Sequence, residues 1–199
     1  KCYKFQEETI MIISLIGFMG TGKSSVGEKL SDRLQYQYLD TDDEIVNRAG
    51  ISIPEIFEKY GEKYFRQLEK DALERVVICN KDIVLSTGGG IVLSAYNRRI
   101  LKEKTTAVLL SATAEEIYSR VKDDSNRPLL DVVDPLQEIQ SLLEKRNKYY
   151  NEFELKVETD SHSIDEIVDI IIEKTGVGPG VKHKNESIEE VSEDERTER

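Results

Sequence analysis

A glycine-rich segment near the start of the chain has the residue types needed to bind a nucleotide. Residues 17–24 read Gly-Phe-Met-Gly-Thr-Gly-Lys-Ser and match G-x-x-x-x-G-K-[ST] at every fixed position. The glycines let backbone N–H groups curl around an anion, and the N-terminus of the next helix adds partial positive charge. An apolar run precedes the segment and a helical pattern follows it, which is the context that this phosphate-binding loop requires. The residues expected to contact ATP here are Gly20, Thr21, Gly22, Lys23, Ser24 and Ser25.

Two residues of this loop have chemical roles that follow from their types. Lys23 is expected to reach the β- and γ-phosphates and to act as a catalytic residue, while Ser24 offers its hydroxyl to Mg²⁺. GTPases, motor ATPases and small-molecule kinases all have such a loop, so the loop alone does not name a reaction.

Carboxylates follow a second candidate strand. Residues 40–43 read Asp-Thr-Asp-Asp and stand at the predicted carboxyl end of the strand Tyr38–Asp40, where α/β sheets bind ligands. Carboxylates two residues apart on an extended segment point the same way, so Asp40 and Asp42 are expected to act together. One can hold metal-bound water while the other hydrogen-bonds a hydroxyl. Taken alone, the segment is equally compatible with an acidic turn that begins a helix.

Four further patterns could contact a substrate. Arg66 and Glu69 share one helical face, either as a site pair or as a surface salt bridge. Residues 87–90 read Thr-Gly-Gly-Gly at a strand end, where backbone can approach a ligand or form a flexible turn. Arg127-Pro-Leu-Leu follows a polar loop, as expected of a mobile lid that brings a cation to a transferring phosphate. Arg146 then precedes Tyr150 and Glu152 on and just after a helix.

The elements that must position these residues alternate along the chain. Short apolar runs predict strands, and capping patterns and periodicity predict helices. The predicted strands are 12–16, 38–40, 83–86, 107–111 and 155–158, and the predicted helices are 23–34, one that starts at Ser52, 62–79, 113–120, 136–150 and 163–174. This alternation is typical of βαβ units around a parallel sheet. The predicted fold is α/β, a three-layer P-loop NTPase fold similar to nucleoside monophosphate kinases, with a lid, over residues 11–175.

Charge and composition exclude several functions. The 199 residues include 28 Lys and Arg against 39 Asp and Glu, a net charge of −11, which argues against nucleic-acid and anionic-membrane partners. Two cysteines cannot form a disulfide framework, so we expect a cytoplasmic protein. Residues 1–10 are expected to be an N-terminal extension or cloning remnant, and residues 176–199 an acidic disordered tail.

The combined motifs resemble those of the shikimate kinases. The resemblance covers nearly all of residues 11–175. It rests on G-x-x-G-x-G-K-S at 17–24, D-T-D at 40–42, F-R-x-x-E at 65–69, G-G-G at 88–90, R-P-L-L at 127–130 and R-x-x-x-Y-x-E at 146–152. It implies that ATP and Mg²⁺ are used to phosphorylate the 3-hydroxyl of shikimate, in the chorismate pathway to aromatic amino acids, by an enzyme that acts as a monomer.

The resemblance also implies a role for each matched residue. Asp42 would hold the shikimate hydroxyls and serve as the candidate base, and Asp40 would join Ser24 in the Mg²⁺ shell. Arg66 and Arg146 would bind the shikimate carboxylate, a contact for which the planar guanidinium is better suited than an ammonium. The other implied roles are for Glu69 to orient Arg66, for Gly88, Gly89 and Gly90 to contact a ring hydroxyl, for Arg127 to touch ATP and act as a catalytic cation, and for Arg120 to stack on adenine.

Two alternatives remain at this stage. A P-loop kinase for gluconate or a nucleoside monophosphate would share the loop, but the paired arginines with D-T-D and G-G-G argue against it. A catalytically silent nucleotide-binding regulatory domain would be expected to have lost site residues. The residues that argue against such a loss are Lys23, Asp42, Arg66, Arg127 and Arg146.

Overall fold

A computed structural model describes residues 11–122 and 132–178 of the chain. The expectations for residues 1–10, for Arg127 and most of the predicted lid, and for the tail beyond 178 lie outside these described residues.

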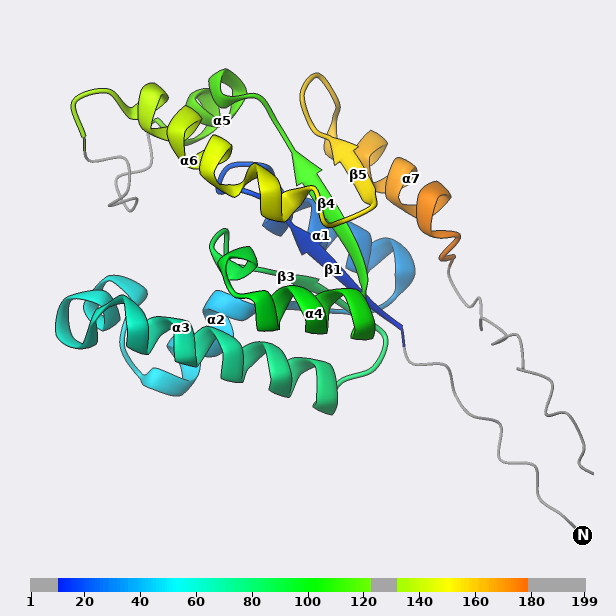
Figure 1. The fold of residues 1–199 in the computed structure, drawn as a ribbon. Helices are drawn as coiled ribbons and strands as arrows, with labels where there is room; N and C mark the ends of the chain where they lie inside the picture. The colour runs from blue at the N-terminus through cyan, green and yellow to red at the C-terminus, as the bar shows by residue number, and fades with distance from the viewer. Residues whose placement is uncertain (1–10, 123–131, 179–199) are drawn as a thin grey trace, which may run out of the picture.

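Five parallel strands form one sheet in the order β2-β3-β1-β4-β5 (Figure 1). Their bounds are β1 Ile12–Ile16, β2 Gln37–Asp40, β3 Ile83–Ser86, β4 Thr106–Ser111 and β5 Leu155–Glu158. The central strand β1 pairs with β3 on one side and β4 on the other, so Leu15 lies opposite both Ser86 and Val108. The strands β2 and β3 lie on one side of β1, and the later strands β4 and β5 lie on the other. Ligands bind at such a switch point in strand order, beyond the carboxyl ends of the strands.

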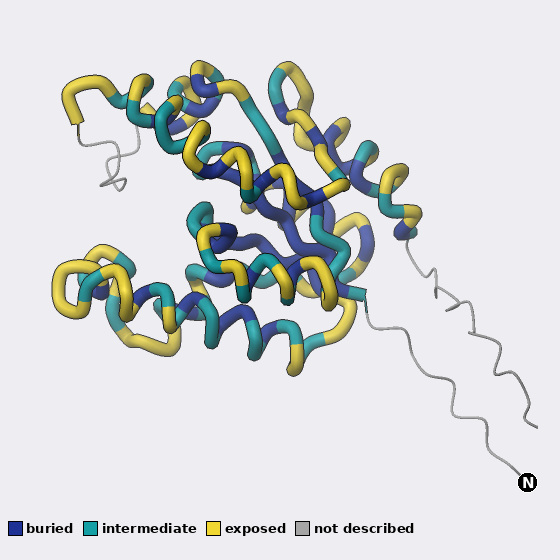
Figure 2. Tube along the Cα trace, viewed as in Figure 1, coloured by how far each residue is buried: buried dark blue, intermediate teal, exposed yellow. Residues whose placement is uncertain are grey.

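Helices cover both faces of this sheet. The helices α1 (Lys23–Leu34) and α7 (Ile164–Thr175) pack on one face, against β1 side chains such as Ile13 and Leu15. On the other face, Ile12 and Ile16 pack with α3 (Ile53–Cys79), the 3-10 turn η1 (Ile91–Leu93), α4 (Ala95–Lys104) and the end of α6 (Pro135–Tyr150). Figure 2 shows the central strands β1 and β3 buried between these layers. The predicted three-layer α/β fold is confirmed.

Side-chain caps start several helices at the predicted residues. Ser52 and Ser163 each form a full capping box, in which the serine and the glutamate three residues later bond each other's backbone N–H. Thr113, at the start of α5 (Ala114–Val121), accepts from the Glu116 N–H but donates its own N–H to Asp160. This last contact ties the start of α5 to the turn after β5.

The long helix α3 contains the predicted break between two helices. Gly61 has φ 78° and ψ 172°, a left-handed backbone that favours glycine, and helical residues continue on both sides of it. The sequence did not predict the helix α4, and it offered the start of α2 (Thr41–Ala49) only as the alternative for the acidic segment. Both are rich in polar residues, and in α2 only Thr41 and Ile45 are buried, so their apolar periodicity is weak.

The folded unit extends slightly beyond its predicted end at residue 175. Gly176 ends α7 with φ 66°, and Val177 then packs into the core with Val168 and Ile171. Within residues 11–122 and 132–178, no helix combines the length and the apolar content that crossing a membrane requires.

Candidate active site

The predicted phosphate-binding loop joins β1 to α1 beside a large cavity. Gly20 has φ 74° and Gly22 has φ 89°, conformations that a side chain would strain. Lys23 Nζ donates to the Phe18 carbonyl at 2.8 Å, and Thr21 Oγ1 donates to the same carbonyl at 2.8 Å. These bonds fold the loop around the N-terminus of α1, where backbone N–H groups are available to an anion.

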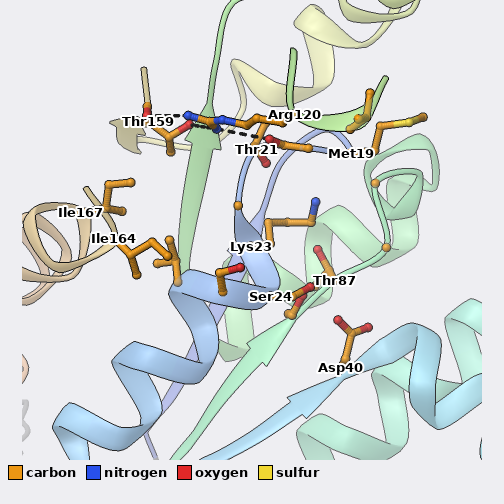
Figure 3. Close-up of a pocket in the computed structure, with 18 of the residues that line it drawn as sticks. Met19, Thr21, Lys23, Ser24, Asp40, Thr87, Arg120, Thr159, Ile164 and Ile167 are labelled. Carbon is orange, nitrogen blue, oxygen red and sulfur yellow. Dashed lines mark hydrogen bonds between the residues drawn. The ribbon is translucent and has the colours of Figure 1, made fainter. Parts of the chain in front are cut away.

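The cavity has a volume of about 590 Å³ and brings the predicted nucleotide and metal residues together. Figure 3 shows Lys23 and Ser24 from α1 directed into it, with Asp40 on the opposite wall. This size suits a small-molecule site, for which volumes of about 300–1,000 Å³ are usual.

Arg120 lies at the mouth of this cavity and is held by several contacts. Its guanidinium donates to Thr159 Oγ1 and to the Thr159 carbonyl, both at 2.9 Å, and to the Gly20 carbonyl at 3.2 Å (Figure 3). Ile164 and Ile167 of α7 form an apolar part of the same wall. Sequence reasoning missed Thr159 and these isoleucines, because Thr159 reaches the cavity through the pairing of β5 with β4, and the isoleucines reach it through the packing of α7.

The acidic segment has a different backbone from the one expected. Asp40 ends β2, and its Oδ1 accepts the Asp42 N–H at 2.8 Å, which caps α2. Asp42 therefore lies in the first turn of a helix, so the expectation that both carboxylates project from one extended segment is wrong. Both side chains nevertheless line the same cavity.

The oxygen ligands present fit a magnesium site. Mg²⁺ keeps several waters and uses one or two carboxylates together with substrate phosphates. Ser24 and Asp40 face the cavity from α1 and β2 and provide that kind of ligand. The part of the chain that the structure describes has no cluster of three or more His, Cys, Asp or Glu that could hold a metal by itself.

Asp42 has the electrostatic properties of a proton acceptor. Its Oδ1 is buried and has no hydrogen-bond partner among the described residues. Burial and the neighbouring charges of Asp40 and Asp43 raise the pKa of Asp42 to about 6, although Lys23 and Arg66 act in the opposite direction. Because a good general base has a pKa near the working pH, this environment suits the role that the sequence assigned.

Arg66 and Glu69 form a partly buried pair and not a surface salt bridge. Arg66 Nη1 donates to both carboxylate oxygens of Glu69 at 3.0 Å, and its Nε and Nη2 donate to Glu62 Oε1. The Glu69 side chain is 1% exposed, and burial raises its pKa to about 7 although Arg66 lowers it. Two glutamates thus fix the guanidinium, and Glu62 was not predicted.

Residues 87–90 after β3, the glycine loop, lie against residues of α2 and α3. The Gly88 N–H donates to Thr41 Oγ1 at 2.9 Å, and a Cβ at Gly88 would lie 2.7 Å from Asp42 Oδ1. A Cβ at Gly90 would lie 2.5 Å from Arg66 Nη1. A side chain at Gly88 or Gly90 would therefore have to displace Asp42 or Arg66, while the approach of this loop to a ligand remains a prediction.

Arg146 approaches the glycine loop from α6. Its Nη1 donates to the Gly89 carbonyl at 3.0 Å, and its guanidinium lies 5.1 Å from the centre of the Phe18 ring. The Tyr150 hydroxyl donates to the same carbonyl at 3.3 Å, and burial raises the pKa of Tyr150, which keeps it protonated as a donor. Phe18 thus contacts Arg146, and Tyr150 contacts the glycine loop, because α6 packs against this end of the sheet.

The structure thus brings the predicted residues together at the carboxyl edge of the sheet, with Arg127 outside the described residues. The family model for shikimate kinase matches residues 19–175. The chain belongs to the shikimate kinase family. It is 42% identical to the shikimate kinase of Geobacter metallireducens over 156 residues, which cover 78% of this chain and 87% of that protein. It is 44% identical to the shikimate kinase of Pelotomaculum thermopropionicum over 160 residues, 80% and 92% of the two chains.

Solved structures agree with this assignment. A shikimate kinase from Acinetobacter baumannii in complex with shikimate has a TM-score of 0.80 and 38% identity, covering 84% of this chain and 94% of that one. The shikimate kinase of Aquifex aeolicus has a TM-score of 0.74 and 39% identity, with coverage of 83% and 96%. A gluconokinase from Sinorhizobium meliloti covers 83% of this chain and 91% of its own, at 17% identity and a TM-score of 0.52, so it shares the fold alone. The chain is an ATP-dependent kinase of the shikimate kinase family, and the gluconate alternative is not favoured.

Proposed function

We propose that this chain transfers the γ-phosphate of ATP to the 3-hydroxyl of shikimate, giving shikimate 3-phosphate and ADP in the chorismate pathway. The observation that carries this proposal is the position of the glycine loop between the two halves of the site. A Cβ at Gly89 would lie 3.2 Å from the Met19 N of the phosphate-binding loop, and one at Gly90 would lie against Arg66. A γ-phosphate on the first loop and an acceptor beside Arg66 would therefore be neighbours.

On the nucleotide side, the backbone of residues 20–25 and Lys23 hold the phosphates, and Arg120 contacts the adenine. Ser24 and Asp40 hold Mg²⁺, which when bound supplies positive charge that offsets the charge of the β- and γ-phosphates. Arg127, which the sequence places after a polar loop, adds a cation to the transferring group. Catalysis on this side is positioning and charge neutralisation, because phosphoryl transfer passes through a loose transition state.

On the acceptor side, Arg66 and Arg146 bind the shikimate carboxylate, and Glu69 orients Arg66. The backbone of Gly88, Gly89 and Gly90 contacts a ring hydroxyl. Asp42 accepts the proton of the 3-hydroxyl while that oxygen bonds to the γ-phosphorus, and the bond from this phosphorus to the bridging oxygen breaks as ADP leaves. The unpartnered Oδ1 of Asp42 supports this assignment.

The remaining assignments concern the localisation, oligomeric state and partners of the enzyme. We propose a cytoplasmic monomer that uses neither nucleic acid nor membrane as a partner. The net charge of −11 supports the exclusion of polyanionic partners.

An assay of ADP release tests this function. Purified protein with ATP, Mg²⁺ and shikimate should release ADP and form a product heavier by one phosphoryl group. Gluconate and nucleoside monophosphates, tested in parallel, should release no ADP above the background without acceptor. ATP binding with no transfer to shikimate or to the panel would identify a silent nucleotide-binding domain and overturn the proposal.

A further inference from the structure

Glu152 closes the 146–152 motif, but it does not reach the active site. It follows the end of α6, and its carboxylate binds two cations of α4. Arg98 Nε donates to Glu152 Oε1 at 2.9 Å, and Lys102 Nζ donates to Oε2 at 2.8 Å. These hydrogen bonds lower the pKa of Glu152, so the carboxylate stays charged at neutral pH.

Arg98 also binds the segment that leaves the glycine loop. Its Nη1 donates to the Val92 carbonyl at 2.7 Å and lies 3.4 Å from the Leu93 carbonyl, both in η1. Its guanidinium lies 4.5 Å from the centre of the Tyr149 ring on α6, and its side chain is only 12% exposed. One guanidinium thus joins η1, the carboxylate after α6, and an α6 aromatic ring.

The backbone of η1 continues directly into the acceptor site. The Ile91 N–H donates to the Gly88 carbonyl and the Leu93 N–H donates to the Gly90 carbonyl. From the other side, Arg146 and Tyr150 of α6 donate to the Gly89 carbonyl. The glycine loop is therefore connected to α6 twice, once directly and once through η1, Arg98 and Glu152.

We propose that Arg98 and Glu152 are positioning residues for acceptor binding, an inference that rests on the proposed function. Their pair fixes η1 and the glycine loop relative to α6. It therefore sets the separation between Arg146 and the loop backbone on which the acceptor carboxylate and hydroxyl are held. The pair contacts η1 and α6 and not the phosphate-binding loop. Loss of the pair is therefore expected to weaken binding of the acceptor and not binding of ATP.

The shape of the arginine is essential to this arrangement. Its Nε and Nη1 point at two partners at once, a carboxylate and a backbone carbonyl, whereas a lysine ammonium is a single point of charge. Lys102 provides a matched control, because it binds the same carboxylate from a position one turn further along α4, and its side chain is 43% exposed.

Steady-state kinetics of four variants tests the proposal. Arg98→Met and Arg98→Lys should each raise the KM for shikimate about tenfold, as expected for loss of charge-assisted hydrogen bonds. The KM for ATP should stay within about twofold and kcat within about threefold. Glu152→Gln should raise the shikimate KM less, about threefold, because an amide oxygen can still accept from Arg98. Lys102→Met should leave both KM values within about twofold of the parent.

Amide hydrogen exchange gives a second measurement that needs no substrate. In ligand-free protein, exchange of the amides of residues 88–93 should become faster in Arg98→Met and Arg98→Lys and stay unchanged in Lys102→Met. If the Arg98 variants only lower the melting temperature, with the shikimate KM or this exchange unchanged, the pair is merely structural and the proposal is wrong. If the parent protein does not phosphorylate shikimate, the proposed function fails, and the exchange result alone decides whether the pair fixes the loop.

Discussion

The proposed nucleotide side of the site is formed mainly by the backbone of one stretch, residues 17–25, whereas the proposed acceptor side is formed by side chains from separate elements. On the first side, glycines with positive φ and the start of α1 present N–H groups. On the second, Asp42 comes from α2, Arg66 and Glu69 from α3, and Arg146 from α6. A single replacement on the proposed acceptor side therefore alters the contribution of one element, whereas a change in the backbone of residues 17–25 alters several N–H groups at once.

The two sides also differ in where charge is buried. The acceptor side places two carboxylates, Asp42 and Glu69, in surroundings that raise the pKa of both, to about 6 and about 7. The nucleotide side contributes Lys23, which lies close to the carbonyl of its own loop. We therefore expect the pH response of the enzyme to come mainly from the acceptor side.

The largest expected effect is on the nucleotide side. Lys23→Met should lower kcat at least about 1,000-fold, because the loop loses the cation that faces the transferring phosphate. Shikimate affinity measured by calorimetry should change less than about twofold. Lys29→Met, on the same helix but paired with Asp165 at the surface, is the control and should have nearly the parent's kcat. An equal loss in both variants would mean that helix stability, not phosphate contact, is responsible.

Asp42→Asn should have the next largest effect. General base catalysis is usually worth about 10²–10⁴ in rate, and an amide cannot accept the proton of the hydroxyl. We expect kcat to fall about 100- to 1,000-fold with the KM for ATP nearly unchanged. The exposed neighbour offers a control, since Asp43→Asn should stay within about threefold of the parent. A similar kcat for the Asp42→Asn variant and the parent enzyme would remove Asp42 from the chemistry.

Arg146→Met should affect binding more than turnover. Loss of a charge-assisted contact to a carboxylate costs about 1.5–3 kcal/mol, which corresponds to a rise of about 10- to 100-fold in the KM for shikimate. Lys145→Met, one residue earlier and exposed, should leave this KM unchanged. If kcat falls by the larger factor and KM does not change, Arg146 acts on the transferring phosphate and the assignment of the two sides must be revised.

The last prediction concerns stability and its dependence on pH, and not activity. The pKa of Asp42 is raised from 3.8 to about 6 in the folded protein, so the folded state binds a proton more tightly than the unfolded state. Its contribution to the free energy of unfolding is fully present below pH 4 and is lost as the pH rises through 6. Asp42→Asn should therefore gain stability relative to the parent, by up to about 3 kcal/mol, between pH 4 and pH 7.5.

Urea unfolding of both proteins at pH 4, 5.5 and 7.5 measures this difference. Glu69 contributes a slope of the same sign in both proteins, and a smaller one in the variant, because the Asp42 charge is one of the causes that raise the pKa of Glu69. A difference that does not change with pH would show that the Asp42 carboxyl has an ordinary pKa in the fold.

Local patterns predicted much of this molecule. The loop at 17–24 is contiguous, the strands 12–16 and 83–86 are short apolar runs, and Ser52 and Ser163 form capping boxes. Each of these features depends on neighbouring residues, so the sequence contains the necessary information in one place. The break at Gly61 was predictable for the same reason.

Features that depend on tertiary contact were not predicted. The helix α2 begins where Asp40, at the end of β2, caps it. The apolar periodicity of α2 is too weak to predict a helix from the sequence. Thr41 joins the site because α2 and the glycine loop converge, and Tyr150 of the 146–152 pattern reaches the Gly89 carbonyl because α6 packs on that loop. These contacts join residues that are distant in sequence, so no spacing rule within one segment reveals them, whereas the Glu62–Arg66 contact follows the i,i+4 rule and was overlooked.

The glycine loop has one more consequence, for engineering. Because a Cβ at Gly89 would lie 3.2 Å from Met19 N, the glycine loop and the phosphate-binding loop approach each other through their backbones. In the proposed function, the distance between donor and acceptor therefore depends mainly on the main chain of these two loops. To bind a new acceptor, side chains around Arg66 and Arg146 can be replaced while the backbone of both loops stays in place.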